Sequence, residues 1–116
     1  MGRNQRVGTW GEQAASEYLE AHGYEILDRN LRTPYGEIDL LARVDRQTVF
    51  VEVKTRTSSI FGPPELAVGR RKQAHMIACA QHYAQQNAIE HWRIDVLAVE
   101  RVGRQTQITH FENAVS

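Results

Sequence analysis

Two short segments of this 116-residue chain carry side chains that could perform metal-assisted chemistry. They are residues 37–41, Glu-Ile-Asp-Leu-Leu, and residues 50–54, Phe-Val-Glu-Val-Lys. If a turn of two or four residues joins them as an antiparallel hairpin, Asp39 lies opposite Glu52. Opposed side chains in such a pair lie ~5 Å apart, and residues two apart on a strand share a face. The register therefore predicts one cluster on one face, made of Glu37, Asp39, Glu52 and Lys54.

Two carboxylates this close repel each other unless one is protonated or a cation lies between them. Carboxylate oxygens are hard ligands that select Mg²⁺ or Mn²⁺, and such an ion polarises a phosphate oxygen and lowers the pKa of a bound water. Lys54 would then hydrogen-bond the attacking water or stabilise the charge of the transition state. The alternative is a cross-strand ion-pair network without chemistry, and residue type and position favour neither interpretation.

Hydrophobic patterning predicts the elements that would position this cluster. In chain order they are a helix at 9–21, strands at 24–29, 37–43 and 48–54, a loop at 58–68, a helix at 70–86, a strand at 92–99 and a return strand at 107–111. The hairpin is apolar on one face, and its charged face becomes apolar at Leu41 and Phe50, which is typical of a sheet covered on both sides. We therefore expect one α/β domain over residues 1–116, with a central mixed sheet flanked by helices.

Other classes of site find little support in the sequence. The chain has one cysteine, Cys79, so an internal disulfide is impossible, and its place among alanines suggests a packed small residue. The sequence contains no CxxC or HExxH motif and no phosphate-binding glycine loop. No apolar run follows the N-terminus, so we expect neither a signal peptide nor a membrane span, and a cytoplasmic location is the default.

The net charge is zero, so the chain lacks the global basic character of many nucleic-acid-binding proteins. Residues 12–52 are nevertheless acidic overall, and residues 54–72 are basic overall. An acidic segment followed by a basic one would suit a metal site beside a phosphate track, although charge alone favours accidental surface patterning. The candidate nucleic-acid-binding residues are Arg56, Arg70, Arg71 and Lys72.

Five ordered blocks of the sequence resemble one small bacterial family. They are residues 11–15 (GEQAA), 30–32 (NLR), 36–40 (GEIDL), 50–56 (FVEVKTR) and 93–96 (RIDV). The spacing of Asp39 from Glu52-Val53-Lys54 is similar to the D…(D/E)xK signature of the PD-(D/E)XK nucleases, and the blocks together look like the YraN family. This resemblance spans about residues 6–100. It implies a restriction-endonuclease-like fold with an αβββαβ core and an activity distantly similar to that of Holliday junction resolvases.

The same resemblance implies roles for individual residues. Asp39 and Glu52 would be metal ligands, the Val53 carbonyl would be a third, and Lys54 would be the catalytic lysine. Glu12 would complete the site from the first helix, although a capping box with Thr9 at the helix start also explains it.

Three further polar residues carry weaker implications. Gln73 would correspond to a polar residue that some relatives present from the second helix, and its alternative is an amide at the edge of that helix. Arg93 and Asp95 would either orient the site or brace the fourth strand, and bracing is the favoured interpretation.

The predicted function is that of a Mg²⁺- or Mn²⁺-dependent endonuclease that hydrolyses phosphodiester bonds of nucleic acid, with DNA favoured and branched DNA included. The alternative is a nucleic-acid-binding module that keeps the fold without turnover, and a protein scaffold with an ornamental ion-pair cluster is the least favoured class. A homodimer is also expected, because cutting two strands symmetrically needs two sites.

Overall fold

The computed structural model describes residues 6–56 and 68–115. Its elements are α1 (Arg6–Ala21), β1 (Glu25–Thr33), β2 (Gly36–Val44), β3 (Gln47–Arg56), α2 (Arg70–Gln86), β4 (Trp92–Val102) and β5 (Gln105–Val115). The five strands form one sheet in the order β1-β2-β3-β4-β5, in which β3 and β4 are parallel and the other neighbours are antiparallel. The αβββαβ order, the α/β class and the mixed sheet expected from the sequence are therefore confirmed. The predicted loop at 58–68 lies outside the described residues except for Val68.

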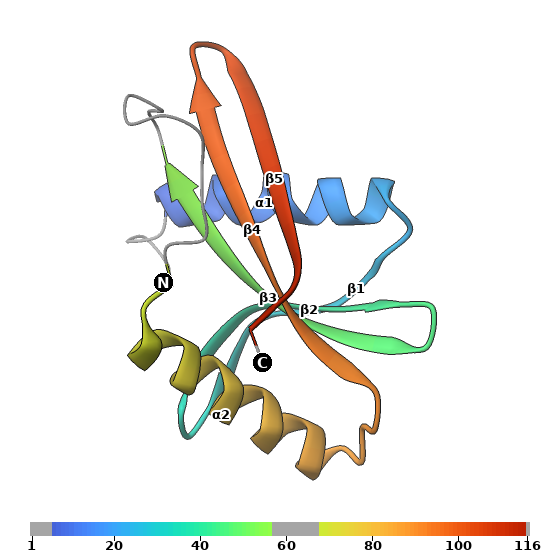
Figure 1. Ribbon diagram of the computed structural model, residues 1–116. Coiled ribbons are helices and arrows are strands. Elements are labelled where there is room, and N and C mark those ends of the chain that lie inside the picture. The colour runs from blue at the N-terminus through green and yellow to red at the C-terminus, as the bar shows by residue number, and fades with distance from the viewer. Residues whose placement is uncertain (1–5, 57–67, 116) are drawn as a thin grey trace.

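The two helices cover opposite faces of the sheet, so the molecule has three layers (Figure 1). The α1 side of the core is built from Ala15, Leu19, Tyr24, Leu40, Ala42, Val49, Val51, Leu97 and Val99. The α2 side is built from Ile38, Leu41, Phe50, Met76, Cys79, Ala80, Ile94, Val96 and Val115. Apolar residues on both faces of β2 and β3 are explained by this double coverage. Over the described residues, neither helix is long and apolar enough to cross a membrane.

Helix α1 ends at Ala21 as predicted but begins at Arg6, so the expected start at Thr9 is wrong. An N-cap residue needs a non-helical backbone, whereas Thr9 lies inside the helix. Gly11 then has a packing role, because a Cβ at this position would lie 2.2 Å from the Thr55 Oγ1 atom of β3. The missing side chain lets α1 approach the sheet closely beside the segment that carries Glu52 and Lys54.

Strand β1 runs from Glu25 to Thr33, beyond the predicted end at Arg29. The extension covers residues 30–33, of which three are polar. Within the described part of the chain, β1 is an edge strand with β2 as its one neighbour, and most of its polar residues are exposed. Water can therefore solvate side chains that a central strand would have to bury.

The hairpin of β2 and β3 has the predicted register. Its ladder runs from Val44↔Gln47 to Leu40↔Val51, and a two-residue turn at 45–46 joins the strands. The ladder ends at the pair of Leu40 and Val51, so the expected ladder pairing of Asp39 with Glu52 is wrong.

Two neighbours of Asp39 accordingly depart from the prediction. Glu37 is the ladder partner of Arg32 on β1, with Arg32 Nε 3.3 Å from Glu37 Oε2, and the β2–β3 ladder does not extend to Glu37 and Lys54. Ile38 joins the α2 side of the core, although simple alternation would place it on the α1 side with Leu40. The alternation breaks where β2 leaves β3 and where Asn30 of β1 has a positive φ of 51°. The strands separate at this point, and the candidate site lies in the opening.

Candidate active site

The site begins where the backbone ladder between β2 and β3 ends. Beyond Leu40, the Val53 N–H of β3 donates to the Asp39 Oδ2 atom at 2.8 Å, so a side-chain carboxylate accepts a hydrogen bond from the neighbouring strand. This bond fixes the carboxylate of Asp39 against β3. The predicted meeting of Asp39 with the Glu52-Val53 segment is thus achieved through a side chain and not through paired backbones.

The Asp39 and Glu52 carboxyl groups share a hydrogen bond. Burial and the Asp39 charge raise the pKa of Glu52 from its ordinary 4.5 to about 7. Burial also raises the pKa of Asp39, although the Val53 N–H acts in the opposite direction. Because the carboxylates repel each other when both are ionised, the metal-free pair retains a proton as long as the pH stays below about 7.

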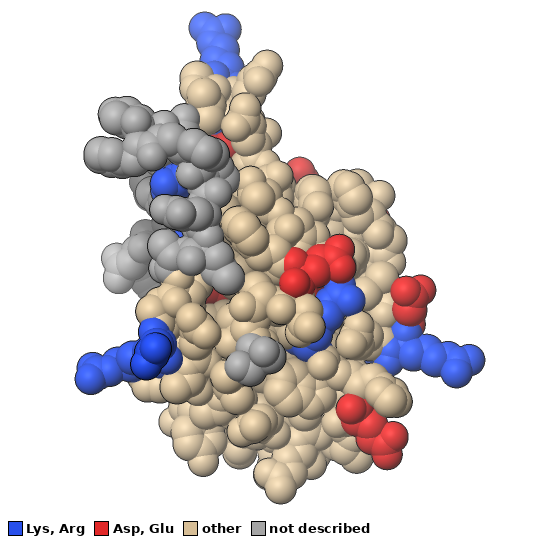
Figure 2. All heavy atoms as spheres, viewed as in Figure 1, with Lys and Arg blue, Asp and Glu red and all other residues tan. Residues whose placement is uncertain are grey.

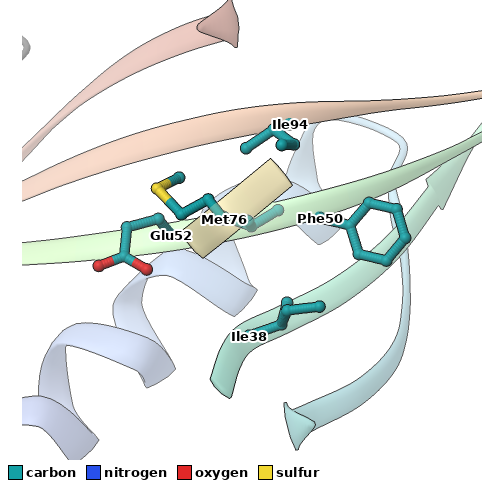
Figure 3. Close-up of a pocket in the computed structure, with 6 residues that line it drawn as sticks. Ile38, Phe50, Glu52, Met76 and Ile94 are labelled. Carbon is teal, nitrogen blue, oxygen red and sulfur yellow. The ribbon is translucent and has the colours of Figure 1, made fainter. Parts of the chain in front are cut away.

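Glu52 faces the α2 layer, and its side chain is only 16% exposed. It lines a cavity of about 10 Å³ together with apolar side chains that include Phe50, Met76 and Ile94. In Figure 3 the carboxylate points away from the Phe50 ring and lies on the Met76 side of the cavity. Such a space holds at most about one water molecule, so the cavity is too small to be a substrate pocket. Its apolar side chains form a wall behind the Glu52 carboxylate.

Lys72 reaches the same carboxylate from the first turn of α2. Its Nζ atom lies 3.3 Å from Glu52 Oε2, and its charge lowers the pKa of both Glu52 and Asp39. Lys72 was a candidate for nucleic-acid binding from the sequence, and the structure places its ammonium group on the carboxylate pair. This contact escaped the sequence analysis because twenty residues separate the two partners along the chain and only the β3–α2 packing brings them together.

Lys54 lies two residues beyond Glu52 on β3 and is half-buried. Strand alternation therefore places it on the same face of the sheet as Glu52. In the parallel ladder, Lys54 pairs with Ala98 and Glu52 pairs with Val96, so both residues sit at the β3–β4 junction near the centre of the sheet. The shared face of Glu52 and Lys54 that the sequence predicted is consistent with this register.

Glu12 approaches the site from α1. Burial and the Asp39 charge raise the pKa of Glu12, while a hydrogen bond from the Asn30 side chain and the Arg29 charge lower it. Asp39 is therefore within electrostatic reach of both layers, with Glu12 on one side and Lys72 on the other. Because Thr9 lies inside α1, it is not the N-cap of this helix, and a capping box does not explain Glu12.

The donor chemistry of Asp39 and Glu52 fits a hard divalent cation, because two carboxyl groups held in contact provide oxygen ligands where negative charge is poorly compensated. The Val53 carbonyl follows Glu52 directly and remains the predicted third ligand. Within residues 6–56 and 68–115, no group of three or more His, Cys, Asp or Glu side chains is placed to hold a metal. The set that fits is thus a pair of carboxylates, and Glu12 is a neighbour of that pair.

The remaining predicted residues lie around this pair in different ways. The Gln73 Nε2 atom donates to the Val68 carbonyl at 2.7 Å and so holds the segment that enters α2; its catalytic role stays a prediction. Arg56 binds Glu100, with Nη2 and Oε2 2.6 Å apart, and the Glu100 side chain is 2% exposed. Arg70 and Arg71 are exposed on the first turn of α2, and basic side chains project from that end of the molecule in Figure 2.

Arg93 and Asp95 belong to a separate polar network on the α1 face. Asp95 is fully buried and accepts hydrogen bonds from Arg93 Nε at 2.9 Å, His110 Nε2 at 2.7 Å and the Asn113 N–H at 2.9 Å. Burial alone would raise the pKa of Asp95, but the bonds from His110 and Arg93 hold it below its ordinary value. Arg93 also donates to the Tyr24 hydroxyl at 2.7 Å. These contacts tie β4 to β5 and to the start of β1, as the bracing interpretation expects.

His110 was missed by the sequence analysis, because a lone histidine on a late strand has no recognisable spacing to Asp95. The β4–β5 register shifts between Ile94 and Val96, at Asp95. The signal in the sequence that could have pointed to this irregularity is an aspartate within a largely apolar strand.

Comparison with known proteins places the chain among bacterial relatives. The "UPF0102 protein" of Syntrophotalea carbinolica is 44% identical over 110 residues, which cover 93% of this chain and 89% of that protein. The corresponding protein of Geobacter metallireducens is 45% identical over 113 residues, covering 96% and 93%.

Among solved structures, Pyrococcus furiosus SfsA in complex with Ca²⁺ gives a TM-score of 0.49 at 15% identity, and the aligned region covers 94% of this chain and 65% of that chain. The family model described as "Uncharacterised protein family UPF0102" matches residues 11–99, a range that contains every predicted catalytic and metal-binding residue. The family resemblance expected from the sequence is confirmed, and the chain belongs to family UPF0102.

Proposed function

We propose that this protein is a divalent-metal-dependent endonuclease that hydrolyses phosphodiester bonds of nucleic acid, with DNA as the favoured substrate. The observation that carries the proposal is the half-buried Asp39–Glu52 carboxyl pair, fixed by the Val53 N–H where β2 leaves β3. A protein gains nothing in stability from forcing two carboxyl groups together, since their repulsion and burial oppose ionisation. Strain of this kind is typical of functional sites.

Each residue of the site has a distinct part in the proposed reaction. Asp39, Glu52 and the Val53 carbonyl would hold Mg²⁺ or Mn²⁺, which requires Glu52 to lose its proton. When bound, the ion supplies Lewis acidity toward a phosphate oxygen and lowers the pKa of a bound water. Lys54 would orient the attacking water and stabilise the charge that develops on the phosphate. Glu12 would accept a hydrogen bond from a water at the edge of the site, because its charge already acts on Asp39.

The basic first turn of α2 would supply phosphate contacts. Arg70 and Arg71 are exposed beside Lys72, whose ammonium group reaches Glu52. A nucleic-acid backbone lying along this turn would therefore pass close to the carboxylate pair. Arg56 is a weaker candidate for phosphate contact, because its guanidinium group already neutralises the buried Glu100.

The decisive test is a cleavage panel of labelled junction, flap, duplex and single-stranded DNA, with RNA counterparts, in Mg²⁺ or Mn²⁺. We expect cleavage of at least one substrate by the wild-type protein and a loss of several orders of magnitude in Asp39→Asn and Glu52→Gln. Glu90→Gln, a change of the same chemistry at an exposed position, is the matched control and should cleave normally. Equal cleavage by wild type and both site variants would contradict the proposal.

A nucleic-acid-binding module without turnover is the second candidate. The observation in its favour is that, over the described part of the chain, only two carboxylates and no third acidic or histidine ligand are placed to hold a metal. The same panel distinguishes the candidates. Salt-dependent binding of nucleic acid without cleavage of any substrate, in either metal, would favour the module.

A further inference from the structure

The contact between Lys72 and Glu52 joins a basic helix turn to the proposed metal site. Lys72 Nζ lies 3.3 Å from Glu52 Oε2, and its charge also acts on Asp39. In the metal-free protein this ammonium group is a positive charge in direct contact with the carboxylate pair. It compensates one negative charge, while the hydrogen bond between Asp39 and Glu52 relieves the other.

The two side chains of this ion pair are buried to different extents, and this difference decides which of them can move. The Glu52 side chain is 16% exposed and belongs to the wall of the sheet, whereas the Lys72 side chain is 49% exposed. Lysine side chains of this kind exchange between a protein partner and water with little loss of free energy. The Arg56–Glu100 pair is different, because Glu100 is 2% exposed and would be left buried and uncompensated if Arg56 moved away. Lys72 can therefore leave its partner, and Arg56 is fixed.

A divalent cation at Asp39 and Glu52 would compete with Lys72 for the same carboxylate. The ion brings two positive charges to an oxygen that already faces an ammonium group, and like charges at such separations repel strongly. The ammonium group would then turn toward solvent on the face that carries Arg70 and Arg71. There it would add a third positive charge to the proposed phosphate track.

We propose that Lys72 is an exchangeable counterion of the carboxylate pair, which a divalent metal displaces and which then binds a nucleic-acid phosphate. This inference rests on the proposed metal site and assigns its regulation. Displacement makes metal binding and nucleic-acid binding cooperative, because each ligand removes a competitor of the other. Thermodynamic linkage requires the effect to be reciprocal, so that nucleic acid raises the affinity for metal by the same factor.

The test measures Mn²⁺ binding by titration calorimetry for the wild type, Lys72→Met and Arg104→Met. Methionine keeps the length of the lysine stem and removes its charge, and Arg104 lies exposed in the β4–β5 turn, so its replacement controls for net charge. Lys72→Met should bind Mn²⁺ more tightly than the wild type by roughly 5- to 150-fold, the usual range for coupled sites. Arg104→Met should match the wild type.

The second measurement is the affinity for a short DNA duplex by fluorescence anisotropy, with Mn²⁺ and with EDTA. Mn²⁺ should tighten binding by the wild type and by Arg104→Met, and the gain should shrink in Lys72→Met. Equal or weaker Mn²⁺ affinity in Lys72→Met, while Asp39→Asn abolishes binding, would overturn the counterion role and leave the metal site intact. If the wild type binds no Mn²⁺ at all, both the metal site and this inference fail. Metal binding with the expected coupling but without cleavage would support the inference and refute the nuclease.

Discussion

The proton held between Asp39 and Glu52 makes the stability of the metal-free protein depend on pH. Burial and the Asp39 charge raise the pKa of Glu52 from 4.5 to about 7, so the folded protein binds this proton more tightly than the unfolded chain does. Between these two values the folded state retains a proton that the unfolded state has lost. The contribution of this proton to the free energy of unfolding is therefore complete below about pH 4.5 and is lost as the pH rises through about 7.

Replacing Glu52 by Gln should remove this dependence. Glutamine has the shape of the protonated acid, carries no charge and can donate to the Asp39 carboxylate. One pKa unit corresponds to about 1.4 kcal/mol, so the shift from 4.5 to about 7 is equivalent to about 3 kcal/mol of lost stability at alkaline pH. Glu52→Gln should equal the wild type near pH 4.5 and exceed its free energy of unfolding by about 3 kcal/mol at pH 8.

Urea unfolding in EDTA at several pH values between 4.5 and 8, followed by circular dichroism, measures this difference. EDTA matters because a bound metal would stabilise the ionised pair and hide the effect. Glu90→Gln, at an exposed position, is the matched control and should follow the wild type at every pH. A constant difference between Glu52→Gln and the wild type over the whole range would refute the assignment of the shared proton to Glu52.

Three further predictions concern packing, a buried charge and phosphate contacts. Gly11→Ala should destabilise the protein in urea unfolding, because its Cβ would meet the Thr55 side chain, although alanine normally stabilises a helix by roughly 0.5–1 kcal/mol. Partial recovery in a Gly11→Ala/Thr55→Ala double variant would identify that clash, and a stabilised single variant would contradict it. Arg56→Met should cost about 3–5 kcal/mol by leaving Glu100 buried without its partner, and Arg56→Met/Glu100→Met should recover most of this; a loss below 1 kcal/mol would contradict a fixed pair. Replacing Arg70 and Arg71 together should lower the slope of log affinity for DNA against log salt by about two, and an unchanged slope would place the phosphate track elsewhere.

The sequence predicted the elements and the family with few errors. Helix α2 occupies the predicted residues, and the β2–β3 register was predicted from the parity of a short turn alone. These features are local, since hydrophobic period, turn length and chain direction fix them before distant segments meet. The start of α1 was wrong, because a capping signature specifies a possible helix start and cannot exclude an earlier one. The single domain and the homodimer stay predictions.

The composition of the site itself was only partly visible in the sequence. Strand alternation and the hairpin register predicted that Asp39, Glu52 and Lys54 lie near one another, because these residues lie on two adjacent strands of one hairpin. The separation of β2 from β3 after Leu40, which lets the Asp39 carboxylate take the Val53 N–H, follows from no local rule. It changes the partners of Glu37 and the face of Ile38.

Contacts between layers were decided by the tertiary structure alone. The approach of Glu12 from α1 and of Lys72 from α2 depends on how each helix packs on the sheet, and a side chain's distance to a residue twenty or more positions away is not encoded in periodicity. The same holds for Asp95, whose histidine partner comes from β5. A sequence of this kind determines which residues share a strand face, whereas packing determines how deeply they are buried and which charges from other elements meet them. Burial and the Asp39 charge raise the pKa of Glu52, and the Lys72 charge from α2 lowers it.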